Sequence, residues 1–90
     1  MIYDIKRRTL KRGKIARREL TSLEGKFLES FKDNKLVLYS ELAKNMYGIE
    51  SETLEDSIKE IKSKIIKKYK IRFKTRYKLG YILLSNIKFI

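Results

Sequence analysis

Apolar residues recur through the third quarter of the chain with the spacing of an amphipathic helix. Successive members lie four, three and four positions apart, which places them on one side of a helix. Acidic residues come early in this segment and lysines later, which is the order that the helix dipole favours. The pattern predicts a helix over residues 52–69 whose buried stripe consists of Leu54, Ile58, Ile61 and Ile65.

The next residues alternate in character, which predicts a β-hairpin over 71–84 that turns near Lys78, Leu79 and Gly80. One face of its first strand would be cationic and the other would carry apolar and hydroxyl-bearing side chains. Tyr77 and Tyr81 fit either the core or, for Tyr77, an exposed tip. The cationic face would consist of Arg72, Lys74, Arg76 and Lys78, and the opposite face of Ile71, Phe73, Thr75 and Tyr77.

Two shorter helices are predicted before the long one. Thr21 and Glu24 have the spacing of a capping box, which begins a helix over about 22–32. Ser40 is a predicted N-cap for a second helix over 40–47, which Gly48 ends by taking positive φ. The inward positions would be Leu23, Phe27, Leu28 and Phe31 on the first helix and Leu42, Ala43, Met46 and Tyr47 on the second.

Residues 2–20 predict short, exposed antiparallel strands over 2–5, 9–11 and 15–20, with Gly13 at positive φ in a turn. A turn at 33–35 and the apolar residues Leu36, Val37 and Leu38 separate the first two helices. The order β-β-(β)-α-α-α-β-β predicts one α+β domain over residues 1–90.

The net charge of +12 is unevenly distributed. Residues 1–20 hold eight Lys/Arg against two acids, residues 21–58 hold four against eight, and residues 59–90 hold eleven against one. A lysine-rich composition alone would not explain the acidic middle. Basic ends that flank an acidic centre favour a polyanion, such as nucleic acid, as partner.

The composition and motifs favour a binding protein over an enzyme. The chain has no Cys and no His, which removes the commonest metal ligands, the commonest general base and a thiol nucleophile. It has neither a GxSxG motif nor a P-loop. We therefore expect no catalytic site, no metal and no cofactor. No apolar run is long enough to cross a membrane, so we expect a cytoplasmic protein.

Four short motifs, in order, resemble those of the OmpR/PhoB-type winged-helix domain, the DNA-binding effector half of many bacterial two-component response regulators. Residues 20–24 (LTSLE) resemble its "LTxxE" motif. Residues 40–42 (SEL) and 47–48 (YG) resemble the two ends of its second helix. Residues 53–65 (TLEDSIKEIKSKI) resemble its recognition helix, and residues 75–81 (TRYKLGY) resemble its "TVRGxGY" wing.

The resemblance implies a winged helix-turn-helix fold whose third helix enters the major groove of DNA, with the C-terminal hairpin as a wing in the adjacent minor groove. Lysine stands at Lys59 and Lys62 where the family has groove-facing arginines, and Lys78 stands at the first glycine of the wing. The implied contacts are Lys59, Lys62, Ser63, Ile66 and Lys67 on the helix, Lys74, Thr75, Arg76, Tyr77 and Lys78 on the wing, and Ser40 and Tyr47 at the second helix.

The resemblance also implies that the protein binds double-stranded DNA sequence-specifically and regulates transcription. Its further implied partners are RNA polymerase or a receiver domain, and its implied assembly is a head-to-tail dimer on DNA. Two alternatives remain open: a non-specific nucleic-acid-binding protein, and a winged-helix protein-interaction module that uses the acidic first and second helices. The acids Glu55, Asp56 and Glu60 would either accept from a cytosine amino group or, as we prefer, form local salt bridges with Lys59 or Lys62 at helical spacing. For the N-terminal Lys and Arg residues, contact with the DNA backbone and contact with another partner both remain open.

Overall fold

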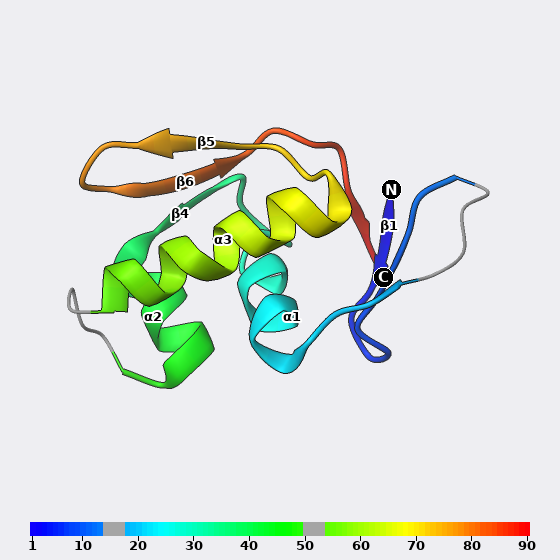
Figure 1. Ribbon diagram of the computed structural model, residues 1–90, viewed down its shortest axis with the longest axis horizontal. Coiled ribbons are helices and arrows are strands. Elements are labelled where there is room, and N and C mark those ends of the chain that lie inside the picture. Colours follow the sequence, from blue (N-terminus) through cyan, green and yellow to red (C-terminus); the bar gives the residue numbers. More distant parts are fainter. Residues whose placement is uncertain (14–17, 50–53) are drawn as a thin grey trace.

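The structure is a computed structural model that describes residues 1–13, 18–49 and 54–90 (Figure 1). Its elements follow in the order β1 (Ile2–Asp4), β2 (Thr9–Lys11), β3 (Arg18–Glu19), α1 (Ser22–Glu29), β4 (Leu36–Leu38), α2 (Tyr39–Tyr47), α3 (Glu55–Tyr69), β5 (Phe73–Arg76), β6 (Gly80–Leu83) and β7 (Lys88–Phe89).

The predicted α+β class is confirmed. Within the described ranges, three helices pack on one another and two sheets flank them, one of four strands and one of three. In Figure 1, α3 lies between the β5–β6 hairpin and the two shorter helices, and the sheet that contains β1 stands at one end. None of the helices in the described residues is long and apolar enough to cross a membrane.

The three-stranded sheet has the order β4-β6-β5, and its central strand is the second strand of the predicted hairpin. The strand β4 was not predicted, although its residues were recognised as apolar. Val37, Tyr81 and Thr75 stand opposite one another in register, and the first two are buried against the helices. The other face carries Leu36, Ile82 and Lys74, and Leu36 is 42% exposed.

Gly80 lies in this sheet and not in the turn. The turn uses residues 77–79, where Lys78 has a φ of 59° and Leu79 N–H donates to the Arg76 carbonyl over 3.0 Å. A Cβ on Gly80 would come within 2.0 Å of the Val37 carbonyl oxygen. The close pairing of β4 and β6 therefore requires a residue without a side chain at this position.

The four-stranded sheet has the order β3-β2-β1-β7. The predicted strands over 2–5 and 9–11 are present, whereas the predicted strand over 15–20 is described only at Arg18–Glu19, because residues 14–17 lie outside the described residues. The strand β7 was not predicted. It runs parallel to β1, with Tyr3 opposite Phe89, and brings the two ends of the chain side by side (Figure 1).

The helix boundaries differ from the predicted ones at three places. α1 ends at Glu29 and not near residue 32, because the next three N–H groups bond to carbonyls three residues back. α2 begins at Tyr39, so the prediction of Ser40 as N-cap is wrong. The N-cap is Leu38, without a side-chain bond, since Tyr39 N–H instead donates to the Leu79 carbonyl over 2.9 Å. α3 is described from Glu55, and residues 52 and 53 lie outside the described ranges.

The core joins the helices to both sheets. The predicted stripe of α3 is buried at Ile58, Ile61 and Ile65, and Leu54 is half-buried. Around it, aromatic rings link α1 to the β5–β6 hairpin: Phe27 lies 5.4 Å from Phe73 in an edge-on arrangement and 6.2 Å from Tyr81. These edge-on and tilted pairs add to the burial of apolar area that fixes the hairpin against the helices.

Glu24 is the one buried charged residue among the described residues, with 1% of its surface exposed. It completes the predicted capping box, since Thr21 N–H donates to Oε1 over 2.9 Å. The same oxygen accepts from the Tyr69 hydroxyl over 3.1 Å, and Oε2 accepts from Lys68 Nζ over 3.2 Å. Glu24 therefore caps the N-terminus of α1 and holds the last turn of α3 beside it.

These contacts shift two pKa values. Burial raises the pKa of the Glu24 carboxyl, but hydrogen bonds from the Thr21 backbone, Lys68 and Tyr69 lower it by more, so the net pKa lies below the usual value. Burial together with the bond to Glu24 raises the pKa of Tyr69 to about 12. The carboxylate is therefore the form that the fold stabilises.

Glu24→Gln is expected to lower the free energy of unfolding by about 2 kcal/mol at pH 7, because an amide cannot accept from all of the donors. A carboxyl with a lowered pKa stabilises the fold above its unfolded-state pKa, and the stability is lost as pH falls through the folded-state pKa. Denaturant unfolding at several pH values should show this loss below about pH 4.5 in the wild type and a smaller one in Glu24→Gln. The exposed Glu60→Gln is the control, and an equal effect of both substitutions would contradict the role of Glu24.

Gly80→Ala should be more destabilising than an ordinary strand substitution. The added methyl group forces β4 away from β6, at a cost of about 2–3 kcal/mol. Gly48→Ala is the matched comparison: at a φ of 76°, nothing lies within 4 Å of an added Cβ, so only the left-handed conformation is penalised, by about 1 kcal/mol. Thermal unfolding of the two variants measures the difference, and a milder effect at Gly80 would contradict the close approach.

Candidate nucleic-acid interface

The face of α3 opposite its buried stripe is open. Four of the five predicted contact residues of the helix are exposed: Lys59, Ser63, Ile66 and Lys67. The Ser63 hydroxyl donates to the Lys59 carbonyl over 3.0 Å, one turn back, and its oxygen can still accept. The face thus presents two ammonium groups, a hydroxyl and an apolar side chain from a rigid helix.

Lys62 differs from the other four because it is half-buried between α3 and the β5–β6 hairpin. Its Nζ donates to Thr75 Oγ1 over 3.4 Å and lies 4.5 Å from the centre of the Tyr81 ring. Burial lowers the pKa of the ammonium, and repulsion from Lys59 lowers it further. Lys62, a predicted contact on the helix, therefore bonds directly to Thr75, a predicted contact on the wing. Its ammonium also lies over the ring of Tyr81, a buried residue that the sequence did not assign to the site.

The hairpin divides its predicted contacts between two faces. Thr75 lies on the side of α3, whereas the register places Lys74 and Arg76 on the other face of the sheet, where both are exposed. Tyr77 is 82% exposed at the tip, with Lys78 Nζ 5.4 Å from its ring centre. The tip and the edge strand β5 are thus the parts of the hairpin that can reach a partner also touched by α3.

The two predicted contacts on α2 lie at opposite ends of that helix. Ser40 is exposed and lines an open depression together with Tyr39, Glu55, Lys78 and Leu79, where the start of α2, the start of α3 and the hairpin tip meet. Tyr47 is half-buried against the core. The structure brings Ser40 close to the hairpin but does not bring Tyr47 there.

Of the three acids of α3, Glu60 forms a local salt bridge of the predicted kind, but with a lysine that was not predicted. Glu60 pairs with Lys64 over 3.6 Å, one turn further on, and not with Lys59 or Lys62. Both side chains are well exposed, so the pair contributes at most about 1 kcal/mol. Because the pair forms at spacing i,i+4 with the glutamate first, it follows the orientation that the helix dipole favours.

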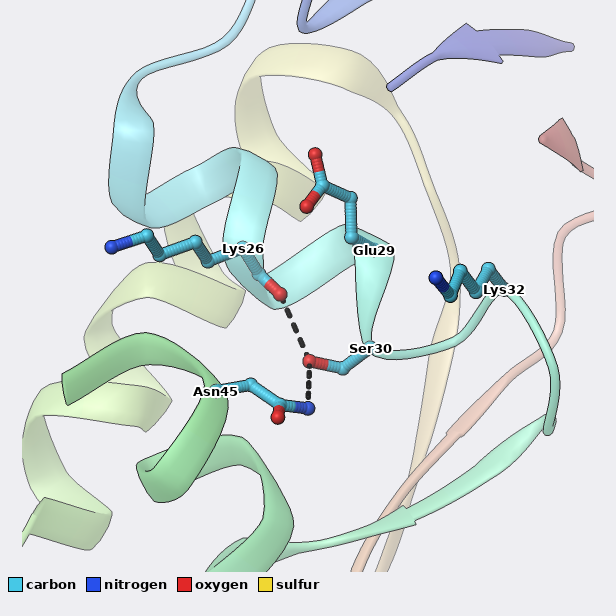
Figure 2. A pocket seen from close by; sticks show the side chains of 5 residues that line it. All are labelled: Lys26, Glu29, Ser30, Lys32 and Asn45. Atoms are coloured by element: carbon cyan, nitrogen blue, oxygen red, sulfur yellow. Dashed lines mark hydrogen bonds between the residues drawn. The ribbon is translucent and has the colours of Figure 1, made fainter. Parts of the chain in front are cut away.

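A second open depression lies between α1 and α2 and shows no catalytic arrangement. Figure 2 shows the Ser30 hydroxyl between the helices: it donates to the Lys26 carbonyl over 2.9 Å and accepts from Asn45 Nδ2 over 3.0 Å. Glu29 and Lys32 complete its lining. The serine is bound by a carbonyl and an amide, so it has no base here. The described ranges also contain no group of three or more acidic residues that could hold a metal.

Comparisons with known protein families, with curated proteins and with solved structures gave no match to this chain.

Lys59→Gln should raise the pKa of the Lys62 ammonium, because it removes the repulsion while leaving the burial unchanged. An NMR titration of the lysine side chains measures this value directly. The charge-matched control is Lys44→Gln, an exposed position on α2, which should leave the Lys62 pKa unaltered. An unaltered pKa in Lys59→Gln as well would contradict the proximity of the two ammonium groups.

Proposed function

We propose that this chain is a sequence-specific double-stranded DNA-binding domain with a winged helix-turn-helix fold, a transcription regulator of the OmpR/PhoB response-regulator effector type. In this proposal α2 and α3 form the helix-turn-helix, α3 is the recognition helix and the β5–β6 hairpin is the wing. The order α1–β4–α2–α3–β5–β6, with β4 completing the sheet of the hairpin, supports it. Support also comes from the concentration of positive charge after residue 58.

The observation that carries the proposal is the junction of α3 and the hairpin through Lys62. Its contacts with Thr75 and Tyr81 hold a strand rich in cations against a helix whose open face is also cationic. A helix of this width fits the major groove, and a hairpin fixed beside it can follow the neighbouring backbone. The two elements would therefore contact one duplex as a single rigid surface.

The proposed roles follow from side-chain chemistry. Lys59 and Ser63 would read base edges, Lys67 a base edge or a phosphate, and Ile66 a thymine methyl group. Arg76, Lys74 and Lys78 would bind phosphates, with Thr75 and Tyr77 beside them and Ser40 at the backbone near α2. Tyr47 would support α2 from the core. Lysine has no planar fork, so selectivity would depend on several single contacts.

A second candidate, a protein-interaction module, is favoured by one observation. The outer face of the three-stranded sheet exposes an apolar row, with Leu36 and Leu38 on β4 and Leu84 just after β6. Such a row is typical of a surface that binds another protein. It differs from the acidic helices that the sequence suggested for this role.

If the DNA proposal holds, the protein works in the cytoplasm, and RNA polymerase or a receiver domain are its proposed further partners. A head-to-tail pair on direct repeats is the proposed assembly on DNA.

The proposal predicts salt-sensitive and sequence-selective binding to duplex DNA. A preferred sequence is first selected from a random duplex library, and the affinities for it and for random duplex are then measured at several salt concentrations. With about six phosphates neutralised, log K should fall against log salt with a slope of roughly −5. Lys59→Ala and Lys62→Met should reduce the ratio of specific to random affinity, whereas Arg76→Ala should weaken both alike.

Lys44→Ala on α2 removes one charge outside the proposed surface and should change neither affinity by more than about twofold. Equal affinity for all duplexes would contradict sequence-specific regulation and favour a non-specific nucleic-acid-binding protein. Absence of duplex binding at low salt would contradict DNA binding and favour the protein-interaction module.

A further inference from the structure

The charge of α3 reverses along its length. Residues 54–60 hold three acids against one lysine, whereas residues 61–72 hold six Lys/Arg and no acid. The hairpin leaves the end of α3 and returns alongside it, so its tip meets the acidic start of the helix at Glu55. The positively charged side chains of the helix are therefore concentrated at its other end, away from the hairpin tip and toward the four-stranded sheet (Figure 1).

Three of the lysines in this second half already have partners. Lys62 contacts Thr75 and Tyr81, Lys64 pairs with Glu60, and Lys68 pairs with Glu24. For Lys67 and Lys70 the described part of the chain provides no ion pair and no side-chain hydrogen bond, and both are exposed. These two are the lysines of the segment that an external anion can bind without breaking an internal contact.

Lys70 stands where a glycine would be more stable. It is the C-cap of α3 in the left-handed conformation, with a φ of 58°, and its N–H donates to the Ile66 carbonyl over 3.0 Å. The same chain ends α2 with Gly48 at the equivalent position. A side chain in this conformation is penalised by about 1 kcal/mol relative to glycine. The helix dipole favours a positive charge at this position, but the left-handed backbone conformation favours glycine over lysine.

A residue of a different element contributes a second cation at the same end of α3. Arg18, on β3, donates through Nη1 to the Lys68 carbonyl, and its guanidinium lies 5.1 Å from the centre of the Tyr69 ring. The guanidinium has five N–H donors in a planar fork, which suits a phosphate. Arg18 is exposed, and its orientation is set before any partner arrives.

We propose that Arg18 and Lys70 form a second phosphate-binding site for duplex DNA at the C-terminal end of α3, opposite the hairpin tip. This inference rests on the proposed function and extends the contact from the hairpin to the four-stranded sheet. The 15 residues of α3 span about 22 Å, so phosphates would be bound at two places roughly 20 Å apart. It also gives the basic N-terminal strands a role in DNA binding through Arg18.

Lys70→Gly tests the site because its effects on stability and on binding have opposite signs. The glycine should raise the melting temperature by about 4 °C or more, since it relieves the left-handed conformation. It should weaken binding to the selected duplex about 3- to 10-fold at moderate salt and reduce the salt slope by roughly 0.9. Lys70→Arg keeps the charge and should retain the wild-type affinity and slope.

Backbone footprinting by hydroxyl radicals separates this site from the rest of the interface. Lys70→Gly should lose protection at one edge of the footprint, and Arg76→Ala at the other edge. Arg18→Lys, which keeps the charge without the fork, should weaken the same edge as Lys70→Gly. Lys26→Ala, a loss of one charge on α1, is the control and should leave the footprint intact.

The outcomes are distinguishable. If the wild type binds duplex and responds to Lys59→Ala, but Lys70→Gly binds with unchanged affinity and slope, the second site is refuted and the proposed function stands. If the wild type binds no duplex at low salt, the proposed function fails and the second site fails with it. A Lys70→Gly protein that is less stable than the wild type would refute the conformational argument.

Discussion

The buried carboxylate of Glu24 is the interaction on which the arrangement of the helices depends. A carboxylate with 1% exposure is costly unless each oxygen accepts hydrogen bonds, and here Oε1 accepts two and Oε2 accepts one. The donors come from two helices: Thr21 is the N-cap of α1, and Lys68 and Tyr69 are the last two residues of α3. Satisfying one charge therefore fixes where α1 begins and how far α3 extends past it. Arg18 donates to the Lys68 carbonyl at this same end of α3.

The hairpin is positioned by a different kind of constraint, the close packing of backbone and rings. Gly80 lets β4 approach β6 so that Val37 and Tyr81 lie side by side under the helices. Tyr81 in turn stacks edge-on with Tyr39, at 5.1 Å, and forms the support on which the Lys62 ammonium rests. The packing of these apolar and aromatic side chains thus determines the position of the Lys62 ammonium between α3 and the hairpin.

Local patterns were sufficient to predict much of this fold. The capping box at Thr21 and Glu24, the stripe of α3 and the left-handed Gly48 depend on neighbours within four residues, and all three are confirmed. The strands β4 and β7 were missed because each has two or three residues and pairs with a partner distant in sequence. Ser40 was misplaced because the carbonyl of Leu79, in the distant hairpin turn, accepts the hydrogen bond of the preceding N–H, that of Tyr39. The same limit applies to the candidate site. Sequence identified the exposed lysines, but only the structure shows that Lys62 contacts Tyr81 and that Arg18 contacts Lys68 and Tyr69 at the end of α3.

The parallel pairing of β7 with β1 joins residues 86 positions apart, such as Ile2 and Lys88. Contacts of this separation close a very large loop, and they form late because the chain must lose much of its freedom first. The helices and the hairpin, by contrast, are connected by short segments and can assemble from nearby contacts. During synthesis the proposed DNA-binding elements would therefore fold before β7 pairs with β1. The β1 edge would then remain open for pairing with other chains until the final strand closes it.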